Sequence, residues 1–156
     1  MRAVLPDAEA RWLDLAAMNL PRFRDLRPHF LKEQDQTLMS VLANMQWADD
    51  IVFVAPIYWY SLPAPAKLFL DHWSGFLDAP DLDFPSSLTG KRLWLITCRA
   101  DPDPDVARPV EDMMRRTAQW LGLTWGGALH GIGTDPGDVE KDQAWRRAAS
   151  FFAGVT

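Results

Sequence analysis

The sequence has very little cysteine, and this limits the kinds of site that it can build. One cysteine, Cys98, among 156 residues provides neither a disulfide framework nor a thiolate cage for a metal ion. Basic residues are also fewer than acidic ones, 16 against 21, for a net charge of −5. A nucleic-acid-binding protein usually carries a basic patch, so no nucleic-acid partner is expected.

Long apolar stretches are missing as well. No run approaches the ~18 residues that a membrane span needs, and the first residues, MRAVLPD, contain no apolar segment of the kind found in secretory signals. The sequence therefore predicts a protein of the reducing cytoplasm without membrane insertion. With 48% apolar and 24% charged residues, it has the composition of a single folded domain over 1–156.

The content of tryptophan and proline is unusually high, with eight tryptophans and twelve prolines. Between the prolines, short apolar runs alternate with segments of helical period. The apolar runs predict strands at 11–16, 51–55, 93–98 and 123–130. Apolar residues spaced three and four apart predict helices at 35–45, 66–77, 110–121 and 138–152, with loops at 56–65 and 78–89.

The order β-α-β-α-β-α-β-α predicts a parallel sheet with helices on both faces. The run at 51–55 is apolar without alternation, which is typical of a strand that is covered on both sides. Ligands of such sheets bind where the strands end and the following loops begin. The candidate binding loops are therefore 56–62 and 97–106.

The first of these loops contains three consecutive aromatic residues, Tyr58, Trp59 and Tyr60. At the end of a strand they can form a flat platform for a planar ring, with nearby backbone N–H groups to hold its heteroatoms. They can equally well pack beneath the next helix. Composition alone gives the two interpretations equal weight.

The stretch 48–71, ADDIVFVAPIYWYSLPAPAKLFLD, resembles the signature of the flavodoxin-like NAD(P)H-dependent FMN reductases and NAD(P)H quinone reductases. In that family an Ala-Asp pair precedes a buried strand, Pro-x-Tyr-Trp closes the strand, and Pro, Lys and Asp mark the following helix. Looser likeness at 88–92 and 120–127 extends the resemblance over most of the chain.

The resemblance implies an α/β fold, a flavodoxin-like doubly wound parallel sheet with FMN at the strand ends. The implied chemistry is hydride transfer from NAD(P)H, the co-substrate, through the flavin to a small-molecule electron acceptor such as a quinone or a free flavin. The flavin carries this chemistry, so no catalytic side chain is expected. The resemblance also implies a homodimer, with 56–77 in the contact. It maps the flavin-binding positions onto Pro56, Ile57, Tyr58, Trp59, Tyr60, Ser61, Thr97, Cys98 and Arg99.

The sequence departs from the family in two places. The second flavin loop, from Thr97 to Asp105, lacks the family's glycines, so its side chains narrow the expected flavin site. The chain also has no counterpart of the family's first, central strand and its phosphate-binding loop, about 25–30 residues. Either the chain is a fragment or comes from a wrongly started reading frame, or the fold has been rewired. Because loss of the central strand would expose a long apolar edge, we expect the first, an N-terminally truncated domain. Losing several charge-assisted hydrogen bonds of ~1.5–3 kcal/mol each predicts that this chain binds FMN weakly or not at all.

No metal site is predicted. Asp101, Asp103 and Asp105 begin like a calcium loop, but the later Gly and Glu of such a loop are absent, so a solvated acidic loop that caps the next helix is expected. The three histidines lack metal-ligand spacing. Cys98 is expected to be a small packing residue. Arg99 has two interpretations, a contact to an anionic ligand or an ordinary surface arginine.

Two other functions remain open. The first is an electron-transfer flavodoxin without NAD(P)H activity, which a measurement of NAD(P)H oxidation distinguishes from a reductase. The second is an interaction module that keeps the fold and has lost the flavin together with its phosphate loop. A flavin absorption spectrum tests this second alternative.

Overall fold

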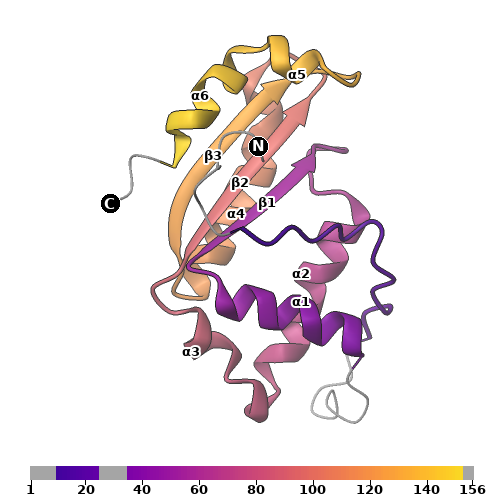
Figure 1. The fold of residues 1–156 in the computed structure, drawn as a ribbon, viewed down its shortest axis with the longest axis vertical. Coiled ribbons are helices and arrows are strands. Elements are labelled where there is room, and N and C mark those ends of the chain that lie inside the picture. Colours follow the sequence, from indigo (N-terminus) through magenta and orange to yellow (C-terminus); the bar gives the residue numbers. More distant parts are fainter. Residues whose placement is uncertain (1–9, 25–34, 153–156) are drawn as a thin grey trace.

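A three-stranded parallel sheet is the centre of the fold in the computed structural model, which describes residues 10–24 and 35–152. The strands lie in the spatial order β1 (Asp50–Pro56), β2 (Arg92–Arg99) and β3 (Thr124–Ile132). Figure 1 shows them side by side and pointing the same way. The parallel α/β architecture and the three strands predicted at 51–55, 93–98 and 123–130 are thereby confirmed.

The helices follow the predicted periodicity closely. The four longer ones are α1 (Gln36–Trp47), α2 (Ala64–Leu77), α4 (Arg108–Trp120) and α6 (Gln143–Phe151). The carboxylate of Asp35 accepts a hydrogen bond from the Leu38 backbone N–H at 2.9 Å and caps α1 as expected. No helix in the described ranges is long and apolar enough to span a membrane.

The strand predicted at 11–16 is wrong. The carboxylate of Asp14 accepts a hydrogen bond from the Ala16 backbone N–H at 3.0 Å, which closes a turn. Further upstream, the Arg11 guanidinium lies 3.8 Å from the centroid of a Trp47 ring on α1. This segment therefore packs against α1 instead of joining the sheet, because local side-chain hydrogen bonds compete with a strand ladder.

Two smaller predictions also need correction. The loop expected at 78–89 contains short helical segments, η3 (Pro80–Leu82) and α3 (Phe84–Leu88). The single last helix is divided into α5 (Asp138–Lys141) and α6, because Asp142 has an extended backbone and its side chain caps α6. Proline and aspartate at these positions end one helical segment and begin the next.

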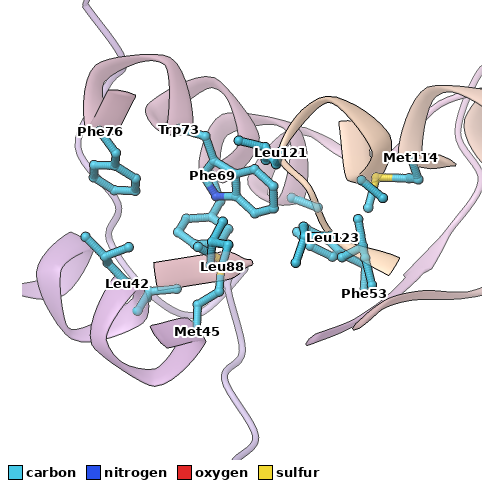
Figure 2. Packing of buried hydrophobic residues seen from close by; sticks show 14 of the residues in the cluster. Leu42, Met45, Phe53, Phe69, Trp73, Phe76, Leu88, Met114, Leu121 and Leu123 are labelled. Atoms are coloured by element: carbon cyan, nitrogen blue, oxygen red, sulfur yellow. The ribbon is translucent and has the colours of Figure 1, made fainter. Parts of the chain in front are cut away.

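The main core lies on the face of the sheet that α1, α2 and α4 cover. Figure 2 shows side chains from these helices and Phe53 of β1 gathered in one apolar cluster. Aromatic rings pack edge to face there, for example Phe69 against Trp73 at 5.8 Å between centroids. The opposite face is covered by α6 and holds a much smaller cluster, formed by Leu129, Ala144 and Ala148 with Ile96 and Phe151 packed against it.

Asp50 begins the sheet with a partly buried polar cluster. Its carboxylate accepts two hydrogen bonds from the Arg92 guanidinium, at 2.6 and 2.7 Å, and one from the Trp94 indole N–H at 2.7 Å. The hydrogen bond from Arg92 is the main cause that holds the pKa of Asp50 below its ordinary value of 3.8. The carboxylate therefore stabilises the fold above that pH, and the stabilisation is lost as pH falls through the lowered pKa.

Replacing Asp50 with asparagine is expected to cost about 1–2 kcal/mol near neutral pH, a moderate figure because solvent reaches a third of the pair. The difference between wild type and variant should shrink at a second pH below 3.8, as the pH approaches the lowered pKa of the wild-type carboxyl. Urea unfolding of both proteins at the two pH values measures this. A difference that does not change with pH would mean that the Asp50 charge is irrelevant to stability.

Candidate cofactor site

The two loops predicted to bind the cofactor meet at the carboxyl edge of the sheet. Pro56 at the end of β1 lies in register with Cys98 of β2. The next backbone N–H, that of Ile57, donates to the Cys98 carbonyl at 2.9 Å. This bond extends the ladder by one residue and joins the start of the first loop to the second.

The first loop folds into a very tight hairpin. The backbone N–H and carbonyl groups of Tyr58 and Ser61 bond to each other in both directions, each at 3.0 Å. The two central residues both have positive φ, +50° at Trp59 and +64° at Tyr60. This is the geometry of a type I′ turn, which normally requires Asn-Gly or a similar pair. Two bulky aromatics in this conformation store roughly 1–2 kcal/mol of strain each.

The aromatic rings of the hairpin face solvent. Trp59 is 94% exposed, Tyr58 60% and Tyr60 56%. The alternative that these residues pack beneath α2 is therefore wrong. A strained turn that presents three exposed rings is costly for the free protein, and such features concentrate at binding sites. The arrangement suits a planar aromatic ligand, which can stack on the rings.

Arg99, at the end of β2, is not a surface residue. It is only 8% exposed, and its guanidinium donates to the carbonyls of Pro102 and Asp103, each at 3.1 Å. The interpretation as an ordinary surface arginine is therefore wrong. Since the side chain turns into the protein beneath the second loop, only the loop backbone at this position is left to face a ligand in this conformation.

Thr97 is also buried, and it belongs to a hydrogen-bond chain that the sequence did not indicate. Its hydroxyl lies 2.7 Å from Nδ1 of His130 on β3, and Nε2 of His130 lies 3.0 Å from a carboxylate oxygen of Glu111 on α4. A carboxylate accepts, so Nε2 donates to Glu111, and in the neutral imidazole Nδ1 then accepts from the threonine. Only the register of β2 and β3 makes Thr97 and His130 neighbours, and no local motif could have revealed it.

Cys98 lies between Thr97 and Arg99 on β2 and is half-buried. Burial raises the pKa of its thiol. The raised pKa keeps the thiol protonated near neutral pH, so it is a poor nucleophile. The expectation of a packing role agrees with this environment.

The acidic segment that follows β2 uses its carboxylates to turn the chain. The Asp101 side chain accepts from the Asp103 N–H at 2.8 Å, and the Asp103 side chain accepts from the Asp105 N–H at 2.9 Å. All three residues are exposed, and Asp103 caps the short helix η4 (Pro104–Ala107). The prediction of a solvated acidic loop is confirmed. Within the described residues, no group of three or more His, Cys, Asp or Glu is placed to hold a metal ion.

The described residues fit the ring of FMN better than its phosphate. Beside the strand ends, a groove of about 280 Å³ lies on the α6 face, and apolar side chains such as Ile96 and Leu129 line it without a lysine or arginine. The helices that follow the two loops, α2 and α4, each have proline in the first turn, which removes a backbone donor from a potential anion site. The aromatic hairpin offers stacking, whereas these elements offer little to an anion.

Comparisons with known proteins agree with this architecture. The family model described as flavodoxin-like fold matches residues 1–152. A relative from Bacillus subtilis (strain 168), named "Putative NAD(P)H-dependent FMN-containing oxidoreductase YwqN", is 28% identical over 112 residues. The match covers 71% of this chain and 62% of the relative, so the chain spans less than two thirds of that protein's length.

Two solved structures are similar in fold. The Trp repressor binding protein from Bacillus subtilis has a TM-score of 0.71 and 27% identity, over 74% of this chain and 76% of that one. An FMN-dependent NADH-azoreductase from Bacillus anthracis, solved with FMN, has a TM-score of 0.63 at 13% identity, over 91% of this chain and 79% of that one. The azoreductase likeness concerns the fold alone. Because the family model matches nearly the whole sequence, this chain belongs to the family with the flavodoxin-like fold.

Proposed function

We infer that this chain belongs to an FMN-dependent oxidoreductase that passes hydride from NAD(P)H through the flavin to a small-molecule electron acceptor. The observation that carries this inference is the strained, exposed aromatic hairpin at the point where two strand-end loops meet. The family membership and the name of the Bacillus subtilis relative support it. When bound, FMN would accept and return the hydride, so the protein needs only to bind and orient the reactants.

The proposed division of labour follows from the geometry. Tyr58, Trp59 and Tyr60 stack on planar ligands, and the bond from Ile57 to Cys98 keeps the two loops together. The backbone of the second loop, from Thr97 onward through 100–104, forms the second side of the site. The described residues then account for holding the flavin ring, and the FMN phosphate needs contacts from elsewhere in the functional protein.

A homodimer is part of the same proposal. A groove of about 250 Å³ lies between α2 and α4, and Trp120 at its rim is 71% exposed. An exposed tryptophan beside a groove that apolar and polar side chains line together is the kind of surface that becomes buried between protein subunits. Sedimentation of the wild type and of Trp120→Gln measures whether two copies associate through this groove.

The test compares FMN with riboflavin, which has the same ring and no phosphate. Fluorescence quenching of each flavin by the 156-residue chain should give two weak and nearly equal affinities, since only the ring is held. A chain extended upstream in its genomic sequence should bind FMN far more tightly than riboflavin and oxidise NAD(P)H. If neither chain quenches either flavin, the hairpin does not bind flavin and the proposal fails.

A flavin-free interaction module is the second candidate. The observation in its favour is the same exposure of Trp59, together with the poor anion-binding character of α2 and α4. An exposed aromatic tip is also a common protein-contact element. Absence of quenching by both chains in the flavin titration would make this the leading function.

A further inference from the structure

The guanidinium of Arg99 is buried at a considerable energetic cost. Its Nη1 is fully buried and has no hydrogen-bond partner, and in the described part of the chain no carboxylate forms an ion pair with it. A buried cation that is only partly hydrogen-bonded loses more hydration than it regains. An apolar side chain of similar length would give the fold equal or greater stability. The presence of arginine here therefore calls for an explanation other than stability.

The bonds that Arg99 does form all fix the second loop. Nε and Nη2 reach two successive carbonyls, of Asp103 and Pro102. The planar fork of arginine can span two such acceptors, which the single ammonium of lysine does not do with the same geometry. The Arg99 carbonyl also accepts from the Gly133 N–H at 2.9 Å, and so ties the start of the loop to the residue after β3.

The fixed loop lies beside the aromatic hairpin. Cys98, the residue before Arg99, receives the hydrogen bond from Ile57 at the base of the hairpin. The segment that begins at Ala100 therefore leaves the sheet next to the stacking surface. Its other local restraints are aspartate turns and prolines, and these set the loop's shape without attaching it to the body of the protein.

We propose that Arg99 is a positioning residue, which holds the loop 100–104 in one place so that its backbone forms the second side of the ligand site. This inference rests on the proposed function, because the ligand concerned is the flavin ring. Arg99 acts through the Pro102 and Asp103 carbonyls and does not contact the ring itself. The unsatisfied buried donor at Nη1 costs stability, and the same side chain preorganises the loop for its ligand.

Two variants and one matched control test this role. Arg99→Met keeps the length and removes the donors, and Arg99→Lys keeps the charge and loses the fork. The control is Arg108→Met, since Arg108 is an exposed arginine paired with Asp105 at the other end of the same loop. Three quantities are measured for each: the urea midpoint, amide hydrogen exchange at Asp103 and Asp105, and riboflavin affinity by quenching.

Arg99→Met is expected to keep the wild-type urea midpoint or exceed it. Exchange at the two aspartate amides should quicken roughly tenfold or more, since charged hydrogen bonds are lost, and riboflavin affinity should fall by about the same factor. Arg99→Lys should not restore either value, and Arg108→Met should change neither by more than about twofold.

A large fall in the midpoint of Arg99→Met, with exchange rising across the whole chain, would overturn the proposal and make Arg99 an ordinary structural residue. Unchanged exchange at Asp103 and Asp105 would also overturn it. If neither this chain nor the chain extended upstream binds riboflavin, the proposed function fails separately, and the exchange data alone decide whether Arg99 holds the loop.

Discussion

Replacing Gly126 with alanine should destabilise this protein by about 3 kcal/mol. A Cβ at this position would lie 2.3 Å from Cδ2, 2.4 Å from Cε2 and 2.6 Å from Cε3 of Trp94. These atoms belong to the rigid indole ring, which is 1% exposed, is hydrogen-bonded to Asp50 and contacts Phe151 edge to face. The ring has no easy way to move, so the strand or the Asp50 cluster must yield. Urea or thermal unfolding measures the loss.

Gly122→Ala is the matched control for this prediction. Nothing lies within 4 Å of its added Cβ, and its only cost is the backbone φ of +72°, roughly 1 kcal/mol. In a Trp94→Leu background, Gly126→Ala should destabilise the protein much less, because the effects of substitutions at contacting residues are not additive. If Gly126→Ala is no worse than Gly122→Ala, the Trp94 ring does not pack closely against Gly126 in solution.

Replacing the hairpin tip with Asn-Gly, in the double variant Trp59→Asn and Tyr60→Gly, should move stability and ligand affinity in opposite directions. Asn-Gly is the preferred pair for a type I′ turn, so the free energy of unfolding should rise by about 1–3 kcal/mol as the strain at both residues is relieved. Loss of two stacking rings, worth roughly 1–3 kcal/mol each for a planar base, should weaken riboflavin binding by at least about tenfold.

Trp47→Asn serves as the control for the hairpin. Trp47 is another partly exposed tryptophan, at the end of α1 next to the amino end of β1. This variant should leave riboflavin quenching unchanged, because the ring lies at the opposite edge of the sheet. If the Asn-Gly hairpin binds riboflavin as well as the wild type does, the exposed rings of Trp59 and Tyr60 do not form the flavin site.

Most helices and strands could be predicted from the sequence, because the pattern of neighbouring apolar residues determines them. The uninterrupted apolar run at 51–55 formed a strand, and the periodic helix formed after its Asp35 cap, as predicted. The prediction that this strand is covered on both sides is wrong in the described residues, where Val54 is 52% exposed. The failure at 11–16 has a physical reason. An apolar run forms a strand only if it can pair with the edge of a sheet. Here the turn at Asp14 and the contact of Arg11 with Trp47 compete successfully with such pairing.

The candidate site divides in a similar way. The position of the aromatic residues at the end of a buried strand marked the first loop, and their exposure agrees with the platform interpretation. The Trp59-Tyr60 turn could not be predicted, because these residues oppose the local preference for Asn-Gly. The inward direction of Arg99 was equally hidden, since it depends on strand alternation and on carbonyls three and four residues ahead.

By itself, the sequence determined the parallel α/β class, the strand-end loops and the family resemblance, because these depend on periodicity and on contiguous motifs. The tertiary structure alone decided which polar groups meet. The register of β2 and β3 sets Thr97 beside His130, and α4 brings Glu111 to the same imidazole. Such contacts join residues far apart along the chain, and they form only when the strands have paired in this register.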